Sequence, residues 1–460
     1  MCNGFYENGL NCSVTLITLT CLSSVLRGVL FLLKLFGLVL LLTVLVFNIS
    51  PMVSAGIFGE TTLILKVDKS KFNPRAIEAL NGKVVYVAEL APIVIVTVPG
   101  YAKGLLEELP GVLHVSEDIV VEVSGPPPGR GKPDKNKDSE QPPQTLPWGI
   151  DYIDAELSWD ITLGFADING DEDSEVEVAI IDTGVDKDHP DLIGNVKWGI
   201  AVFRGKISSR YNDKNGHGTH VAGIIAAINN DIGVVGVAPA VELYIIKAFD
   251  PTGSAYISDI IIAIDLAVKG PDGVVDSDED GVVVGDVDDD APEVISMSFG
   301  GGSNIPELHD MLKVAYDLNI TLVASAGNEY SSTPSYPAAY SEVIAVGAVD
   351  EEGNVPDWSN KYPELTAPGV NVLSTYPDDS YETLDGTSMA CPHVSGTVAL
   401  LQAARLASGE TPLPPGEEND IDNSSIRGIL HMTAMGTGEY NPLYGYGVVN
   451  AYNALLALES

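Results

Sequence analysis

Apolar residues in the second half of the chain come in short runs separated by longer amphipathic stretches. The runs predict buried strands at residues 176–181, 243–246, 294–297, 321–324 and 343–346, and the stretches predict helices at 221–228, 257–268 and 307–318. Strands that alternate with helices in this way predict an α/β fold with a doubly wound parallel sheet. In such a sheet the functional crevice lies at the carboxyl ends of the strands.

A different pattern precedes this region. Residues 60–124 contain predicted strands at 63–67, 82–87, 93–98 and 112–115, with helices at 74–80 and 101–109. The β-α-β-β-α-β order predicts a small α+β domain with two helices on one face of an antiparallel sheet. Residues 125–146 are rich in proline, glycine and charge, which predicts a linker and an extension leading into a larger domain at 147–460.

The first 55 residues predict a leader. Lys34 is followed by an apolar run to Phe47, and Val53-Ser54-Ala55 offers small residues for cleavage, as in a secretory signal. An uncleaved membrane anchor is the alternative, because the apolar stretch 28–47 is about long enough to span a bilayer. The first interpretation predicts a secreted protein and the second a membrane-anchored one.

Composition narrows the possible partners. The chain has 64 Asp and Glu residues against 24 Lys and Arg, and its net charge is −40. Because nucleic-acid binding needs basic side chains that neutralise phosphates, no nucleic-acid partner is expected. The acid excess instead suits solubility and cation binding. Three of the four cysteines lie within the first 21 residues, so the sequence offers no disulfide framework to the folded body.

An acid, a histidine and a serine occur at places that a parallel sheet would bring together. Asp182 ends the first predicted strand, His217 lies between glycines at a helix start, and Ser388 lies in the first turn of another predicted helix. A serine hydroxyl is a poor nucleophile until a histidine takes its proton, and that histidine needs a carboxylate to fix its tautomer. The three residues therefore predict nucleophilic catalysis in the crevice.

Each motif also has another interpretation. Residues 182–184 have the Asp-Thr-Gly sequence of aspartic proteases, but these enzymes need a second such motif, which the sequence lacks. His217 and His220 suggest a zinc pair, but no third ligand stands at metal spacing, so His220 is expected in the core. Cys391 suggests a cysteine protease, but it lies beyond the motif serine and is expected to be buried packing.

These motifs resemble those of the subtilases, a family of subtilisin-like serine proteases. Residues 182–184, 217–220 and 386–390 match its three catalytic motifs, and Ala326-Gly327-Asn328 matches the motif whose asparagine donates to the oxyanion. The resemblance runs from about residue 147 to 457, and residues 61–124 resemble the family's inhibitory prodomain. It implies a serine endopeptidase made as a zymogen. The acidic insertion and residues 334–340 are most similar to calcium-dependent subtilisins of hyperthermophilic archaea.

The same resemblance implies two walls of a substrate cleft. Gly253-Ser254-Ala255 would form one wall and Ser298-Phe299-Gly300 the other. An extended peptide is expected to pair with both walls as an added strand. Cleavage that releases the prodomain is expected near Ser124-Gly125, at the start of the linker.

Calcium is the expected cofactor, at up to three places. The resemblance implies one site at Gln144, Asp191, Asn230 and the carbonyls of Ile228, Ile232 and Val234. The spacing D-x-D-x-D-G, typical of EF-hand loops, predicts a second one at Asp276, Asp278, Asp280 and Val282, with Asp286 and Asp288 flanking the closing position. A third loop carries oxygen side chains at alternate positions, namely Asp167, Asn169, Asp171 and Asp173. Ordinary hydrated polar loops are the alternative in each case.

These features together predict a secreted, calcium-stabilised serine endopeptidase that acts on proteins or peptides as a monomer. Its own prodomain is the second expected partner, as inhibitor and folding aid. The alternatives are a membrane-anchored protease, or a processing protease of narrow specificity. A calcium-binding scaffold with a dead site is disfavoured because Asp182, His217, Asn328 and Ser388 are all present.

Overall fold

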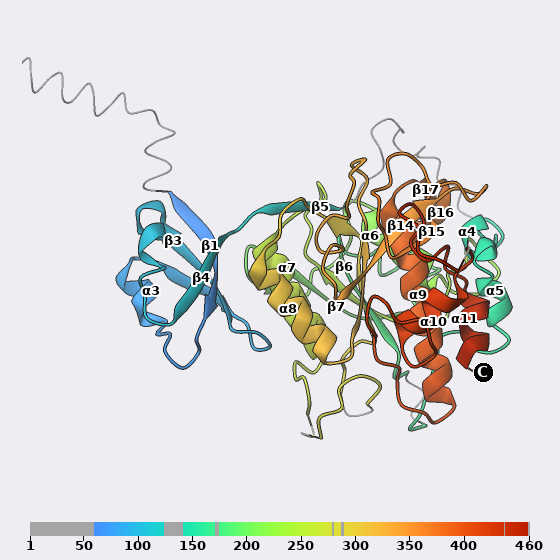
Figure 1. Ribbon diagram of the computed structural model, residues 1–460, viewed down its shortest axis with the longest axis horizontal. Coiled ribbons are helices and arrows are strands. Elements are labelled where there is room, and N and C mark those ends of the chain that lie inside the picture. Colours follow the sequence, from blue (N-terminus) through green and yellow to red (C-terminus); the bar gives the residue numbers. More distant parts are fainter. Residues whose placement is uncertain are drawn as a thin grey trace, which may run out of the picture. The chain divides into compact units, whose positions relative to one another are not determined.

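An eight-stranded sheet runs through the larger part of the chain in the computed structural model (Figure 1). In chain order its strands are β6 (Glu177–Asp182), β7 (Val196–Phe203), β8 (Lys206–Ser208), β9 (Glu242–Lys247), β11 (Val294–Met297), β13 (Thr321–Ser325), β14 (Val343–Val349) and β15 (Leu365–Pro368). Their spatial order is β15-β14-β13-β11-β6-β9-β7-β8. All neighbours run parallel except β7 and β8, which are antiparallel. On one side of β6 the strands β11, β13, β14 and β15 follow one another outward, whereas on the other side the chain passes through β7 and β8 before β9 returns beside β6. A parallel sheet that extends to both sides of its first strand confirms the predicted doubly wound α/β fold.

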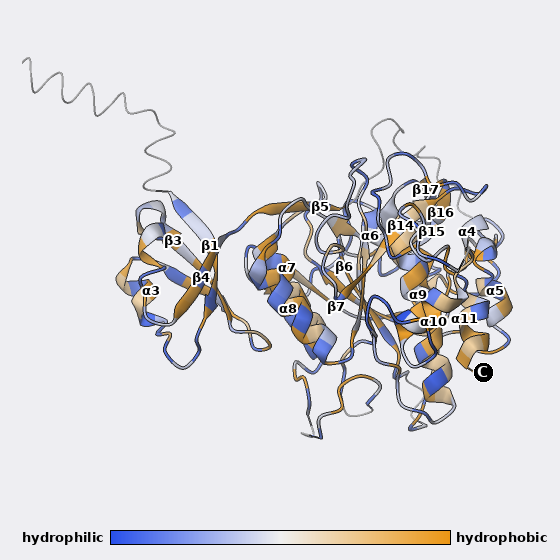
Figure 2. Cartoon of the chain, viewed as in Figure 1, coloured by the Kyte–Doolittle hydropathy of each residue, from blue (hydrophilic) through white to orange (hydrophobic). Residues whose placement is uncertain are grey.

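Helices cover both faces of this sheet, which explains why its strands are apolar throughout. One hydrophobic cluster contains Val178 and Ile180 of β6, and the other contains Ala179 and Ile181. The first cluster includes residues of α6 (His217–Ala226), α9 (Thr387–Ala407), α10 (Ile426–Thr433) and α11 (Ala451–Leu458), with α4 (Trp148–Tyr152) and α5 (Ala155–Ser158) beside them. The second includes α7 (Ile257–Lys269) and α8 (Pro306–Asp317). In Figure 2 α8 shows hydrophilic and hydrophobic bands, as expected for a helix with one face in solvent.

The region before the linker forms a four-stranded sheet of order β2-β3-β1-β4. Its elements are β1 (Glu60–Val67), α3 (Arg75–Ala79), β2 (Lys83–Val87), β3 (Ile93–Pro99), the 3₁₀ helix η1 (Gly100–Leu105) and β4 (Val112–Glu117). β5 (Val120–Val123) leaves this sheet and pairs elsewhere, between β10 (Ser254–Tyr256) and β12 (Phe299–Gly300). A hairpin of β16 (Val372–Tyr376) and β17 (Ser380–Leu384) completes the strands described.

The structure describes residues 59–123, 141–170, 174–277, 280–286, 289–436 and 438–458. Contacts divide the chain into a larger unit, Thr62–Thr97 with Leu106–Ser460, and a smaller one, Met1–Thr61 with Val98–Leu105. The candidate site and β5 both lie in the larger unit. The predicted leader and the bond Ser124-Gly125 lie outside the described residues, and no helix among the residues that are described is long and apolar enough to cross a membrane.

Two predicted helices differ from those observed. The helix predicted at 221–228 begins four residues earlier, at His217, after Gly216 at φ +110°. It ends at Ala226, because the apolar residues that follow are extended and Ile228 donates its N–H to the carbonyl of Asp191. The helix predicted at 101–109 is the short 3₁₀ helix η1. In both places apolar residues that pack in extended or irregular chain were mistaken for a helical face.

Candidate active site

Three elements bring the predicted acid, histidine and serine to the carboxyl edge of the sheet. Asp182 is the last residue of β6, His217 is the first of α6, and Ser388 is the second of α9. All three are buried, with 1%, 4% and 0% of their surface exposed. Nδ1 of His217 lies 2.9 Å from both carboxylate oxygens of Asp182. A histidine held in this way carries its Nδ1 proton toward the carboxylate and turns Nε2 away from it.

A second buried acid, Asp213, holds the strand end and the helix start together. Its Oδ1 accepts from Oγ1 of Thr183 at 3.0 Å and from the N–H of Gly216 at 3.0 Å. Its Oδ2 accepts from the N–H and the hydroxyl of Thr219 at 3.0 and 2.7 Å. Sequence reasoning missed this residue. The signal was an Asp shortly before a helix start, where such side chains commonly accept orphan N–H groups.

Ser388 is tied to the strand region beside it. Its hydroxyl donates to the carbonyl of Ser298 at 3.0 Å, and the Ser298 hydroxyl donates to the carbonyl of Ser388 at 3.0 Å. Nε2 of His217 is buried and has no hydrogen-bond partner among the described residues. Because a serine hydroxyl is a rotor, the Ser388 proton is not confined to its present acceptor.

Asn328 follows β13 and faces the start of α9. Its amide oxygen accepts from the N–H and the hydroxyl of Thr387, each at 2.9 Å. The hydroxyl of Thr387 also accepts from the N–H of Gly327 at 3.0 Å. With the oxygen fixed on Thr387, the amide nitrogen points its donors elsewhere, as an oxyanion donor beside Ser388 requires.

The two predicted walls of the cleft enclose a strand of the chain itself. β5 pairs antiparallel with β10 on one side and with β12 on the other. Val121 lies opposite Ala255, Val123 lies opposite Phe299, and the N–H of Val123 donates to the carbonyl of Gly253 at 2.9 Å. β5 thus occupies the place that an extended peptide would take as an added strand. β5 ends at Val123, and the predicted bond Ser124-Gly125 follows in the sequence.

Comparison with known proteins agrees with this arrangement. Residues 173–447 match the subtilase family. M-protease of Shouchella clausii is 37% identical over 310 residues, which cover 67% of this chain and 69% of that protein. Subtilisin Savinase of Lederbergia lenta is also 37% identical over 310 residues, 67% of this chain and 98% of its own. The chain belongs to the subtilase family. It is a serine endopeptidase, and its α/β sheet is the subtilisin fold. An intracellular serine protease of Paenibacillus polymyxa is 38% identical over 287 residues, 60% of this chain and 79% of that one.

The other polar residues near the site of this subtilase are structural. His220 is fully buried, and its Nε2 lies 3.1 and 3.0 Å from the carbonyls of Val372 and Glu382. Burial lowers the pKa of His220 to about 3 and that of His393 to about 4, so both are neutral. Cys391 is fully buried as predicted, and burial raises the pKa of its thiol to about 11. A thiol with this pKa is not a nucleophile at neutral pH.

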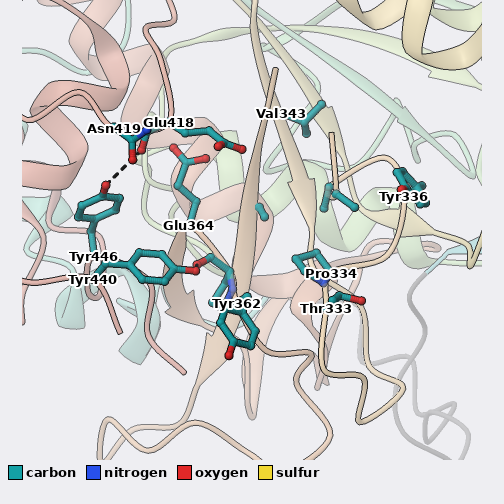
Figure 3. Close-up of a pocket in the computed structure, with 14 residues that line it drawn as sticks. Thr333, Pro334, Tyr336, Val343, Tyr362, Glu364, Glu418, Asn419, Tyr440 and Tyr446 are labelled. Carbon is teal, nitrogen blue, oxygen red and sulfur yellow. Dashed lines mark hydrogen bonds between the residues drawn. The ribbon is translucent and has the colours of Figure 1, made fainter. Parts of the chain in front are cut away.

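A cavity of about 670 Å³ lies beside the loop that follows Asn328 (Figure 3). Thr333, Pro334 and Tyr336 line one part of it, and Glu364 lines another. Glu364 is engaged inside the protein: its Oε1 lies 2.8 Å from Nε2 of His431, and its Oε2 accepts from the Arg427 guanidinium at 3.1 Å. Its carboxylate therefore joins the cavity wall to His431 and Arg427 of α10.

The residues of the first predicted calcium site lie together and are joined by hydrogen bonds. Asn230 donates to Asp191 Oδ1 at 2.9 Å, and the Gln144 amide donates to the carbonyls of Ile228 and Val234 at 3.0 and 3.3 Å. At Gly233 an added Cβ would lie 2.2 Å from Oδ2 of Asp191, so the loop wraps closely around this carboxylate. Carboxylate, amide and carbonyl groups are the kinds of ligand that calcium takes, and here the amide nitrogens of Gln144 and Asn230 face the other oxygens of the loop. Ile232, the remaining predicted ligand, is held by its N–H on the Asn230 side-chain oxygen at 2.7 Å.

The two acidic loops meet at a single cavity of about 400 Å³, which the sequence did not indicate. Asn169 from the first loop and Asp286 from the second both line it, together with Asp289. Oδ1 of Asp276 and Oδ2 of Asp289 are buried with no hydrogen-bond partner among the described residues. Such oxygens are costly unless a cation or a proton reaches them.

The remaining predicted ligands of these loops divide into placed and unplaced residues. Asp167 accepts from the N–H of Gly170 at 2.5 Å, and Asp280 accepts from the N–H of Val282 at 2.7 Å. Asp171, Asp173, Asp278 and Asp288 lie outside the described residues. Among the residues that are described, no group of three or more His, Cys, Asp or Glu side chains is arranged to hold a metal.

Proposed function

We propose that Ser388 is the nucleophile of this endopeptidase, with His217 as general base and Asp182 as the group that orients it. The observation that carries the proposal is the placement of the His217–Asp182 pair and the motif serine at one edge of the sheet. Ser388 Oγ attacks the peptide carbonyl carbon while Nε2 of His217 takes its proton. The proton then passes to the leaving amine, and water hydrolyses the acyl-enzyme by the same route. Asn328 donates to the oxyanion formed in each step.

The protease is made as a zymogen that cuts itself near Ser124-Gly125, and residues 60–124 are its inhibitory prodomain. β5 in the cleft supports this, because a strand that pairs with both walls and ends one residue before the predicted bond resembles a bound product. Other contacts hold the prodomain. Asp118 accepts from the N–H and hydroxyl of Ser258 at 2.9 and 2.7 Å, at the N-terminal end of α7. Asp265 accepts from the Tyr86 hydroxyl at 2.6 Å. These contacts would keep the cut prodomain in place as an inhibitor.

Calcium stabilises the mature enzyme at the Gln144–Asp191 loop and at the cavity shared by the two acidic loops. Support comes from the grouping of Gln144, Asn230 and the carbonyls of the loop around the buried carboxylate of Asp191, and from the unpaired buried oxygens of Asp276 and Asp289. Calcium bound there would neutralise buried carboxylates and stabilise the folded form by linkage. It takes no part in the chemistry of peptide hydrolysis.

The enzyme is secreted by the signal-like leader and acts on proteins or peptides as a monomer. A membrane-anchored enzyme, which the apolar leader would allow, or a processing protease of narrow specificity, which the family would allow, is the alternative. Mass spectrometry of the exported protein distinguishes the secreted from the membrane-anchored enzyme, because it shows whether the leader has been removed.

The test of the catalytic proposal is the Ser388→Ala variant of the full chain. We expect it to lose proteolysis by at least about 10³-fold and to keep its prodomain attached. Ser395→Ala is the matched control, because Ser395 lies on the same helix and donates to Ser296. Cleavage by Ser388→Ala at a rate near wild type would contradict the proposal. A mature N-terminus inside 101–115 or beyond Trp148 would contradict the zymogen part.

A further inference from the structure

The end of β9 places a lysine beside the strand that carries Asp182. In the parallel pairing of β6 with β9, Lys247 lies opposite Asp182. Its ammonium group donates to the carbonyl of Thr183, the residue after Asp182. The next two N–H groups, of Ala248 and Phe249, donate to the carbonyl of Asp182 at 3.1 and 3.2 Å. The lysine is therefore fixed to the backbone that positions the carboxylate.

Two buried acids lie in this corner with it. Asp182 is 1% exposed and Asp213 is 5% exposed, and both belong to the network around His217. Lys247 is half-buried, and burial lowers the pKa of its ammonium while Asp213 and Asp182 oppose that shift. Both carboxylates are thus within electrostatic reach of this cation, in a region where charges are weakly screened.

The other titratable groups around His217 lie on several elements and are neutral, exposed or engaged elsewhere. His220 on α6 and His393 on α9 are buried and neutral. Asp250, after β9, accepts hydrogen bonds from the N–H and the hydroxyl of Thr252. Lys214, in the loop before α6, is exposed, and Glu382 lies on β17. Lys247 is therefore the half-buried cation that Asp182 and Asp213 have in common among the described residues of this corner.

We infer that Lys247 sets the basicity of His217, because it anchors the Asp182–Thr183 strand end and offsets the buried charges of Asp182 and Asp213. The inference rests on the proposed catalytic roles. Lys247 is a positioning residue, since it acts on the base through its neighbours. Without its charge, two buried anions would favour the protonated form of His217. The general base would then be blocked up to a higher pH.

The experiment is the pH dependence of kcat/KM for a peptide substrate, measured with wild type and Lys247→Met. We expect the acidic limb of the variant to shift upward by about 0.3 to 1 pH unit, and Lys247→Arg to return it toward wild type. Lys214→Met is the matched control, because it removes an exposed cation near the same histidine. Any shift of the acidic limb in Lys214→Met should vanish in about 0.5 M salt, whereas the shift in Lys247→Met should persist.

An acidic limb that stays in place in Lys247→Met would overturn the inference, as would an equal shift in Lys247→Arg. If Lys247→Met does not mature, the imidazole of His217 is titrated by NMR in uncut Ser388→Ala and in Ser388→Ala with Lys247→Gln. The same upward shift is expected there, and equal titration curves would overturn the inference. Failure of the catalytic proposal is distinguishable, because it would appear as activity in Ser388→Ala.

Discussion

The two ends of one strand pair handle buried charge in opposite ways. At its carboxyl end, β6 places Asp182 opposite Lys247 of β9, and Asp182 is also bound by His217 and the N–H of Thr183. At its amino end, the same pairing places Glu177 opposite Glu242. Glu293 joins them, and one of its oxygens accepts from the N–H of Glu177 at 2.7 Å. The proposed catalytic end supplies its own counter-charges, and the far end gathers acids.

Among the residues described, the far end lacks counter-charges for two of its three buried acids. Lys197 lies 2.7 Å from the Glu242 carboxylate, but Glu177 and Glu293 have no such cation in the described part of the chain. Burial and the neighbouring Glu293 raise the pKa of Glu177 well above its usual range, and burial raises that of Glu293 to about 8. The cavity shared by the two acidic loops is lined by Glu177 and Glu242 as well. Protons or cations must therefore stabilise this end, whereas the other is preorganised by the chain.

The largest effect is expected from the end that carries the proposed catalytic groups. Asp182→Asn replaces the carboxylate that holds Nδ1 of His217, so the wrong tautomer is favoured and kcat should fall by about 10⁴-fold. The melting temperature should change little, since the shape is kept. Hydrolysis of a peptide substrate and a thermal melt measure both. A loss below tenfold would remove Asp182 from the mechanism.

Calcium removal should act on the other end and, separately, on the Gln144–Asp191 loop. Free calcium at about 100–1000 times its Kd stabilises a folded protein by about 3–4 kcal/mol, which chelation takes away. In the inactive Ser388→Ala background, Asp276→Asn with Asp289→Asn should reduce this calcium-dependent shift of the melt, and Asp191→Asn should reduce it separately. Full, equal shifts in all these proteins would show that neither place binds calcium.

A smaller effect is expected from Glu293→Gln at high pH without calcium. The folded pKa of Glu293, about 8, lies above its usual 4.5, so the neutral form stabilises the fold. This contribution is fully present below pH 4.5 and is lost as the pH rises through 8. Glutamine stays neutral at every pH. Between pH 5 and 9 the free energy of unfolding of the variant should therefore fall by about 2–4 kcal/mol less than that of the parent. Denaturant unfolding in the Ser388→Ala background measures this difference. The exposed Glu352→Gln is the control, and a Glu293→Gln profile as steep as the parent's would contradict the account.

The smallest effect is expected from Lys197→Met. Its partner Glu242 is buried, but the lysine side chain is 39% exposed, so the pair contributes about 1 kcal/mol or less. The substitution should leave peptide hydrolysis unchanged. The loss of stability should be smaller when calcium is added, because a bound cation would then neutralise Glu242. A denaturant melt with and without calcium measures this. A loss of several kcal/mol in calcium would mean that this lysine alone stabilises the far end.

The sequence predicted the parts of the fold that depend on local pattern. Apolar runs located five of the eight strands of the sheet, whereas β7, β8 and β15 were not predicted. Residues 182, 217 and 388 were placed correctly at a strand end and two helix starts. The last turn of α6 was misplaced, because apolar residues 227–228 pack in extended chain. Ala227 makes the last helical hydrogen bond, to the carbonyl of Gly223, and Ile228 donates its N–H to the carbonyl of Asp191 instead.

Features that depend on register were not predictable in this way. Lys247 faces Asp182, and Glu242 faces Glu177, only because β9 pairs with β6 in one alignment. A shift of that register would change both ends at once, and no local pattern reports it. The shared cavity of the acidic loops was missed for the same reason, since Asn169 and Asp286 belong to segments joined only by the fold.

The central claim, that Ser388 is the activated serine, is tested most directly by peptide mapping after reaction with a fluorophosphonate. The account predicts one modified serine, Ser388, and a labelling rate that falls as the pH drops through the titration of the free enzyme. It also predicts that Ser388 in Asp182→Asn is labelled much more slowly than in the wild type. Adducts on another serine, or none on a preparation that cleaves peptides, would contradict it.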